Sequence, residues 1–335
     1  MRSGIHSTIL SVLWLGCCAT WATAADLTWP ARLPIYDHIV IVVEENKDYD
    51  EILGSPHAPY INSVLKAEGA NLTRMFAEEH NSQGNYFWLF SGSNQNVGYF
   101  DIIPDESNNA NYPFQSSNLG FQLIKTGRSF KGYSESLPAV GSEAPYTPDG
   151  FYARKHVPWV SFGNLPQGST VESSCHLRMS DFPTDSAHFS NLPTVAIVVP
   201  NLTNDMHDGA SSVSIPRGDT WLKDHFDHYY QWAKTHNSLL IVTFDENEAH
   251  LIVGLTNPFT DPKNTGKQNR IPTLLAGAHI QHGEFGEGNG VTHVNLLRTL
   301  EAMYGLPKSG NQQPHAAKGG ISDDQIITDI FQPSP

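Results

Sequence analysis

Residues 38–46 read HIVIVVEEN, and this stretch decides the fold. Its first six residues are almost all apolar and β-branched, which is typical of a strand buried on both faces. Three further runs have the same character and are bounded by turn-forming residues: TVAIVV at 194–199, LLIVTF at 239–244 and IPTLLAG at 271–277. Helical patterns alternate with these runs. The sequence therefore predicts an α/β protein with a mostly parallel central sheet and helices on both faces.

Helices are expected where apolar residues recur at helical spacing. The expected segments are 59–67, 119–126, 219–236 and 293–304. Asp219 is expected to cap the first turn of its helix. Residues 98–192, rich in Asn, Ser, Gly and Pro, are expected to form loops and short strands laid over the sheet. Residues 308–335 are expected to be a polar, poorly ordered tail.

The composition excludes one class of partner. The 335 residues contain 20 Lys and Arg against 34 Asp and Glu, so the formal net charge is −14. Binding to a nucleic-acid backbone needs a basic face, and we therefore expect no nucleic-acid partner. With 39% hydrophobic and only 16% charged residues, the chain is expected to fold around a large core as one domain.

The first 24 residues have the pattern of a secretory signal peptide. Arg2 precedes a short apolar run, and Ala22-Thr23-Ala24 is a small-x-small cleavage site. We expect residues 25–335 to form a single secreted or periplasmic catalytic domain; an uncleaved anchor and lipid attachment at Cys17 are the alternatives. Cleavage leaves Cys175 as the last thiol, which is expected to be buried and inert. No later stretch is long and apolar enough to span a membrane, so no stable membrane insertion is expected.

Acidic residues follow three of the predicted strands. Glu44-Glu45-Asn46 follows the first, Asp205 to Asp208 lies just beyond the second, and Asp245-Glu246 follows the third. In open parallel sheets ligands bind outside the carboxyl ends of the strands, so these groups are expected to converge. Carboxylates that converge without basic partners repel each other unless a cation lies among them. The oxygen-rich set predicts a divalent ion: Mg, Ca or Mn, with Zn or Fe as alternatives if imidazoles join in.

Glu44 and Glu45 compete for this role. Successive side chains of a strand point to opposite faces, so the two carboxylates cannot both face the same ion. We assign Glu45 to the metal.

The segment EHNSQGNY at 79–86 supplies a candidate nucleophile. Ser82 stands where it would open a helix whose free N–H groups hold a phosphate, and Asn85 follows one turn later. A metal bound to the Ser82 oxygen would favour its alkoxide. Taken alone, a Ser at the start of a helix is more often only a cap.

At these residues the sequence resembles the phosphoesterase family of bacterial acid phosphatases and phospholipases C, a branch of the alkaline-phosphatase-like superfamily. The resemblance spans roughly residues 38–307, with motifs in this order: HIVIVVEENKDYDEILG, HNSQGNYFWLFSG, YARKHVPW, PNLTNDMHDG, GDTWL, LLIVTFDEN, RIPTLLAG and THVNLLRTLEAMYGLP. It implies an alkaline-phosphatase-like three-layer sandwich.

The resemblance also implies roles for particular residues. The metal ligands would be Glu45, Asn46, Ser82, Asp245 and Glu246; the phosphate ligands would be Asn85, Lys155 and His156. Asp205 and His207 match a segment near the site and would be an alternative second metal site, while His207 and His293 are candidate catalytic acids. The remaining histidines are expected to be solvated or packing residues.

Two departures from the family pattern concern the loop around the nucleophile and the basic pair. Asn81 and Gly84 stand where short members carry proline, so the loop is less rigid. Val157 replaces the Asn that usually follows the Lys-His pair.

The function implied is that of a secreted, metal-dependent acid phosphatase, a hydrolase of phosphate monoesters that acts through a phosphoserine on Ser82. Its substrate would be a small phosphate ester or a lipid phosphate. A phospholipase C-like phosphodiesterase is the first alternative, and it predicts exposed apolar and aromatic residues near the site. A non-catalytic exported metal-binding module is the alternative from another class.

Overall fold

The computed structural model describes residues 33–98, 100–248 and 269–332. The expected signal peptide and Cys17 lie outside these residues. Among the described residues, no helix has both the length and the apolar character needed to cross a membrane.

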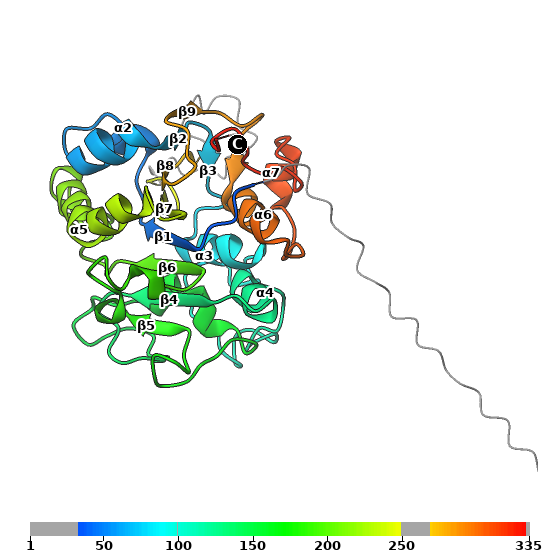
Figure 1. Cartoon of the computed structure of the whole chain (residues 1–335). Coiled ribbons are helices and arrows are strands. Elements are labelled where there is room, and N and C mark those ends of the chain that lie inside the picture. Colours follow the sequence, from blue (N-terminus) through cyan, green and yellow to red (C-terminus); the bar gives the residue numbers. More distant parts are fainter. Residues whose placement is uncertain (1–32, 99, 249–268, 333–335) are drawn as a thin grey trace, which may run out of the picture.

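An eight-stranded sheet forms the centre of the molecule (Figure 1). Its strands are, in sheet order, β5 (His176–Arg178), β4 (Phe130–Ser134), β6 (Val195–Val199), β1 (His38–Glu44), β7 (Ser238–Phe244), β8 (Thr273–Gly277), β2 (Ala70–Leu72) and β9 (Gly283–Phe285). The strands from β5 to β7 are parallel, whereas β8 runs antiparallel to β7 and β2. All four predicted strands are present and the mostly parallel sheet is confirmed. A separate small pair joins β3 (Met75–Phe76) to β10 (Val291–Thr292).

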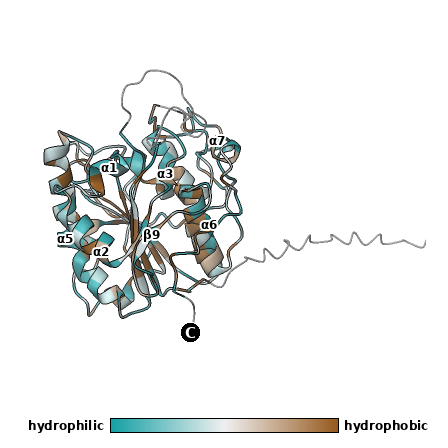
Figure 2. Cartoon of the chain, turned by 90° about the horizontal axis from the view of Figure 1, so that it is seen from above, coloured by the Kyte–Doolittle hydropathy of each residue, from teal (hydrophilic) through white to brown (hydrophobic). Residues whose placement is uncertain are grey.

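Helices cover both faces of this sheet, as Figure 2 shows from above. The helices α3 (Ser82–Ser91), α4 (Leu119–Lys125) and α6 (His293–Tyr304) pack together on one face. The long helix α5 (Ser211–Ala233) lies on the other, with α1 (Tyr49–Ile52), a π-helical turn at Ile61–Leu65 and α2 (Lys66–Glu68). Short 3₁₀ turns occur at Arg154–His156, Pro158–Ser161, Met179–Asp181 and Phe189–Asn191. The predicted three-layer arrangement is therefore confirmed.

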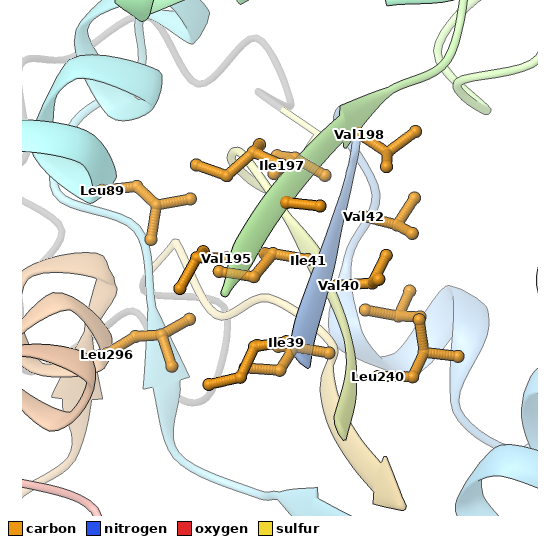
Figure 3. Packing of buried hydrophobic residues seen from close by; sticks show 14 of the residues in the cluster. Ile39, Val40, Ile41, Val42, Leu89, Val195, Ile197, Val198, Leu240 and Leu296 are labelled. Carbon is orange, nitrogen blue, oxygen red and sulfur yellow. The ribbon is translucent and has the colours of Figure 1, made fainter. Parts of the chain in front are cut away.

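The core follows from the apolar character of the central strands. In Figure 3, Ile39 and Ile41 of β1 point towards Leu89 of α3 and Leu296 of α6, while Val42 points away from them. These side chains are fully or almost fully buried. Each contributes about 1.5–3 kcal/mol relative to an exposed position. Because β1 is buried on both faces, its alternation also fixes the face to which the residues after it point.

The helix expected at 219–236 differs from its prediction. It begins at Ser211 and continues through Pro216, a residue that usually ends or kinks a helix. The Asp219 carboxylate therefore caps no first turn; it accepts hydrogen bonds from the backbone N–H groups of Tyr60 and Ile61. A Cβ atom on Gly218 would lie 2.3 Å from Cγ of Met206, so close packing holds this part of α5 against the loop after β6.

Two further expectations are corrected. The segment after Lys308 is packed rather than a loose tail: it forms α7 (Pro314–Lys318) and buries Ile327 and Ile330. Arg298 of α6 anchors it by donating to the backbone oxygen of Ser309 at 2.9 Å. The region 98–192 does not only lie over the sheet, because it also supplies the sheet strands β4 and β5.

Candidate active site

The carboxyl ends of β1 and β7 bring the first group of predicted residues together. The two strands are parallel neighbours in which Glu44 pairs with Phe244, so Glu45-Asn46 and Asp245-Glu246 leave the sheet side by side. The Asn46 backbone N–H donates to Oδ1 of Asp245 at 3.0 Å, and its side-chain amide donates to Oε1 of Glu246 at 3.0 Å.

Ser82 enters this group from the first turn of α3. Asn81 caps the helix, with its side-chain oxygen accepting from the N–H of Gly84 at 2.7 Å. The Ser82 hydroxyl is buried and lies 3.2 Å from Oε2 of Glu45 and 3.4 Å from Oε1 of Glu246. A predicted nucleophile and predicted acids from three distant segments therefore meet at one point.

Two rings surround the other oxygen of Glu45. The Tyr86 hydroxyl donates to Oε1 of Glu45 at 2.8 Å, and Nε2 of His156 lies 3.2 Å from the same atom. The two rings stack with their centroids 5.0 Å apart. Tyr86 was missed by the sequence analysis, although its position one turn after Ser82 places it on the same side of α3.

Burial controls the charges of this group. Burial raises the pKa of Glu45 to about 7, although Lys155 and the hydrogen bond from Tyr86 oppose the shift. Burial also raises the pKa of Asp245, helped by the charges of Glu45 and Glu246. For His156, burial and then the charge of Lys155 lower the pKa well below its usual value. The acids are thus crowded and the imidazole beside them is neutral.

The donor atoms fit a hard cation. Oδ1 of Asn46 and Oε2 of Glu246 are buried and form no hydrogen bond with the described residues, although Nδ1 of His80 lies 3.5 Å from Oε2 of Glu246. Unpaired buried oxygens are costly, so such a pair points to a missing partner. Within the described ranges, however, no three Asp, Glu, His or Cys side chains are arranged to hold an ion by themselves. An ion bound here would therefore need the Ser82 hydroxyl and the Asn46 amide as further ligands.

Lys155 lies close to this group but is held by a partner that the sequence analysis missed. Its ammonium donates to Oδ2 of Asp101 at 2.8 Å. Burial lowers the pKa of Lys155, but the carboxylates of Glu45 and Asp101 outweigh burial, so the pKa is raised and the group stays charged.

Asn85 points elsewhere than predicted from the resemblance. Its side-chain amide donates to the backbone oxygen of Glu79 at 2.6 Å and accepts from the Glu79 N–H at 3.1 Å. Both of its hydrogen-bonding groups are therefore occupied in holding the strand-to-helix connection, and its phosphate-binding role stays a prediction.

Asp205 and His207 border the group from the loop after β6. The backbone oxygen of Asp205 accepts from the N–H of Glu45 at 2.8 Å, and Asp205 itself is buried. The His207 ring is half exposed and its Nδ1 lies 2.8 Å from Oδ1 of Asp208. An imidazole that remains accessible is suited to proton transfer to a substrate.

His293 is placed behind the acids instead of among them. Its Nδ1 lies 2.7 Å from Oε2 of Glu78 and its Nε2 lies 2.8 Å from the backbone oxygen of Phe244. Both ring nitrogens are occupied, and the residue that accepts from Nε2 immediately precedes Asp245. His293 therefore stabilises the end of β7, and these contacts favour a structural role for it.

Glu44 lies on the other face of the sheet, as alternation predicts. Burial, followed by the charges of Asp205 and Glu135, raises its pKa well above its usual value, and Asp219 of α5 also contributes. Its carboxylate forms no hydrogen bond with Ser82 or any other described residue, whereas the Glu45 carboxylate accepts from the Ser82 hydroxyl.

Comparisons with known proteins relate this chain to phosphoesterases over most of its length. The model of the "Phosphoesterase family" matches residues 56–307, a range that contains all the residues above except Glu44, Glu45 and Asn46. A "Phosphatidylinositol-3-phosphatase" of Mycobacterium tuberculosis is 40% identical over 309 residues, covering 92% of this chain and 88% of the relative. A "Probable acid phosphatase" of Kluyveromyces lactis is 27% identical and covers 84% of this chain but 61% of the relative.

A solved structure supports the fold. A protein in the alkaline phosphatase superfamily from Vibrio parahaemolyticus superposes with a TM-score of 0.56 over 82% of this chain and 67% of that one, at 13% sequence identity. At this identity the likeness concerns the fold alone, and it confirms the predicted fold class.

Proposed function

Because this chain belongs to the phosphoesterase family and is a hydrolase of phosphoric esters, we propose that it is an exported, metal-dependent phosphatase that acts on monoesters through a phosphoserine at Ser82. The observation that carries the proposal is the buried Ser82 hydroxyl between the carboxylates of Glu45 and Glu246 at the start of α3. Membership of this family of hydrolases leaves no place for a purely metal-binding module.

The proposed metal ligands are Glu45, Asn46, Ser82, Asp245 and Glu246, whose crowded and partly unpaired oxygens support the assignment. When bound, a divalent ion supplies charge that favours the ionised Ser82 hydroxyl and offsets charge on the phosphoryl oxygens. Asp205 with His207 is retained as the proposed alternative second site.

In the first step Ser82 Oγ, which has released its proton to solvent, forms a bond to phosphorus while the bond from phosphorus to the leaving oxygen breaks. The leaving oxygen takes a proton from His207, an accessible imidazole at this edge of the sheet. We prefer His207 to His293 because both nitrogens of His293 are already engaged. Lys155, with His156 beside it, would hold the equatorial oxygens of the phosphoryl group, and Asn85 would join them only by giving up its two bonds to the Glu79 backbone.

In the second step water attacks the phosphorus of the phosphoserine and gives its proton to His207. The bond to Ser82 Oγ breaks, phosphate leaves, and the starting state is restored. The test is acid quenching during turnover of a nitrophenyl phosphate, followed by mass spectrometry of the Ser82 peptide. A phosphate adduct that is absent from Ser82→Ala supports the proposal, whereas wild-type turnover rates in Ser82→Ala would refute the nucleophile.

A lipid phosphate is the second candidate substrate, and two observations favour it. The Mycobacterium tuberculosis relative is named a phosphatidylinositol-3-phosphatase. In addition, Phe100 and Ile102 flank Asp101, the partner of Lys155, with 85% and 56% of their surface exposed. Large apolar side chains exposed beside a phosphate site suit a substrate embedded in a bilayer.

The substrate candidates separate in one experiment. Hydrolysis is compared for soluble nitrophenyl phosphate, for phosphatidylinositol 3-phosphate in vesicles and for a choline phospholipid in the same vesicles. Phe100→Ser with Ile102→Ser is expected to slow only the vesicle reaction, and Val171→Ser, another exposed apolar position, is the control. Release of phosphocholine would instead favour the phospholipase C alternative.

Export is proposed from the signal-peptide pattern of residues 1–24. Cell fractionation and N-terminal sequencing of the released protein test it. A mature N-terminus at Ala25 is expected, and an uncleaved cell-bound chain would contradict it.

A further inference from the structure

The Asp101 carboxylate joins two parts of the site that lie far apart in the sequence. Its Oδ1 accepts from the side-chain amide of Asn81 at 3.0 Å and from the backbone N–H of Gln83 at 3.1 Å. Its Oδ2 accepts from the ammonium of Lys155 at 2.8 Å. Asn81 and Gln83 are the two neighbours of Ser82. The Asp101 carboxylate therefore binds the chain on both sides of the nucleophile and also binds Lys155, the proposed phosphate ligand.

The bonds on the helix side are those that a helix start needs. The first backbone N–H groups of α3 have no partner within the helix, and an anion near them is stabilised by the positive end of the helix dipole. The Gln83 side chain adds a third link to the same loop, because its amide donates to the backbone oxygen of Ile102 at 2.8 Å.

The bonds on the lysine side are also reinforced. Arg154, the neighbour of Lys155, donates to the backbone oxygen of Pro104 at 3.2 Å. Asp101 has a φ angle of 51°, a left-handed conformation that is unfavourable for a residue other than glycine. A residue persists in such a conformation only where its surroundings hold it. Here its side-chain bonds to Asn81, Gln83 and Lys155 do so.

We propose that Asp101 is a positioning residue that sets the attack geometry of Ser82 relative to Lys155. The inference rests on the proposed function of Ser82 and Lys155 and adds a residue that touches neither the substrate nor the metal ligands. Oδ1 of Asp101 fixes the start of α3. Oδ2 holds the Lys155 ammonium in place until that ammonium binds the phosphoryl oxygens of the substrate.

Two substitutions test it on the full-length protein. Asp101→Ala removes both sets of bonds, and displacing a reacting group by about 1 Å costs up to about a hundredfold, so we expect kcat for nitrophenyl phosphate to fall about 10- to 100-fold. Asp101→Asn keeps an acceptor for the Gln83 N–H but turns an amide donor towards the Lys155 ammonium, so we expect its kcat to lie between those of the wild type and Asp101→Ala. KM is expected to change less than kcat, because ground-state binding does not require an aligned nucleophile.

A second readout separates positioning from general loss of structure. Vanadate mimics the geometry of the transition state and inorganic phosphate does not, so misalignment weakens inhibition by vanadate more than inhibition by phosphate. Asp105→Ala is the matched control: Asp105 lies in the same loop, but among the described residues its carboxylate accepts hydrogen bonds from Ser107 and Asn108 of its own turn and from no residue of α3. We expect this control to keep wild-type kcat and vanadate inhibition.

Unchanged kcat and vanadate inhibition in folded Asp101→Ala would overturn the inference. So would an Asp101→Asn variant that is folded and as impaired as Asp101→Ala. Ser82→Ala is measured in parallel. An inactive Ser82→Ala beside a normal Asp101→Ala rejects only the positioning role, whereas an active Ser82→Ala rejects the proposed function itself.

Discussion

Nδ1 of His293 lies 2.7 Å from Oε2 of Glu78, and both side chains are almost completely buried. The other carboxylate oxygen of Glu78 accepts from the backbone N–H of Val294 at 2.9 Å, so this pair fastens the start of α6 to the chain before the nucleophile. Because the remaining ring nitrogen bonds the end of β7, His293 connects three elements of the site without facing the Ser82 hydroxyl.

His293→Ala is therefore expected to act on stability first. Removing one partner of a buried pair costs about 3–5 kcal/mol, because the other charge is left uncompensated. Denaturant unfolding measures this loss. His188→Ala, which breaks an exposed pair with Asp185, is the control and is expected to leave the unfolding free energy almost unchanged. Wild-type stability with lost activity would restore His293 as a catalytic acid.

Removing the carboxylate of Glu45 is expected to abolish most of the activity, whereas removing that of its neighbour Glu44 is expected to leave the activity almost unchanged. Glu45→Gln removes the carboxylate that lies 3.2 Å from Ser82, and we expect activity to fall by about a hundredfold or more. Glu44→Gln changes a buried side chain whose raised pKa disfavours its charge, on the opposite face, so activity is expected to stay near the wild type. Steady-state kinetics of the two purified variants decide it; equal losses would refute the assignment.

This contrast shows which parts of the site could be predicted from the sequence. The alternation of side chains along a buried strand depends on local sequence, so it could distinguish the face to which Glu45 points from that of Glu44. The acids follow predicted parallel strands, so they could be expected to meet at the carboxyl edge of the sheet. The contacts of Asp101 and Glu78 could not be predicted, because they join segments 54 and 215 residues apart whose meeting depends on the packed fold. α5 was shortened in the prediction because Asp219 was taken as its N-terminal cap, whereas the helix begins at Ser211 and the Asp219 carboxylate binds the distant backbone of Tyr60 and Ile61.

A divalent ion is expected to stabilise the fold as well as activate it. Without a cation between them, the carboxylates of Asp245 and Glu246 repel each other. A ligand that binds only the folded state, at a concentration of 100 times its Kd, raises the free energy of unfolding by about 2.7 kcal/mol. Thermal unfolding of chelator-treated protein, titrated with Mg, Ca, Mn or Zn, measures this gain. The stabilisation by the ion should be lost in the Glu246→Gln variant. It should be kept in the Asp224→Asn variant, because Asp224 is an exposed acid of α5. No shift with any ion would count against the site.

Acid is expected to destabilise the protein through His176. Burial lowers the pKa of this imidazole to about 3 from 6.5, where it lies 3.2 Å from the hydroxyl of Ser134. The folded state resists protonation of His176, whereas the unfolded state takes up the proton readily. The contribution of the uncharged His176 to the free energy of unfolding is therefore complete above pH 6.5 and declines as the pH falls towards 3. The loss between pH 7 and pH 5 is about 2 kcal/mol. Urea unfolding across this range should show a weaker pH dependence in His176→Gln; identical slopes would contradict the assignment.

Gly84 and Glu79 are expected to be coupled, which explains why the proline of the family pattern is absent here. A Cβ atom at position 84 would lie 2.1 Å from Oε1 of Glu79, an oxygen that accepts from Nε1 of Trp88 and from the amide of Asn94, each at 3.1 Å. Any side chain at position 84 must push this carboxylate away from both donors. Such overpacking typically costs about 1–3 kcal/mol.

Gly84→Ala is therefore expected to destabilise the wild-type protein even though alanine favours a helix by about 1 kcal/mol over glycine. In the Glu79→Ala background the closest contact is removed and only a 3.0 Å approach to Oδ1 of Asn81 remains, so the helix preference should outweigh the remaining crowding and the same substitution should stabilise the fold. Denaturant unfolding of both single variants and the double variant completes the cycle. The sign reversal is the diagnostic result, because a Gly84→Ala effect of equal size and sign in both backgrounds would mean that the Glu79 carboxylate does not dictate the residue at position 84.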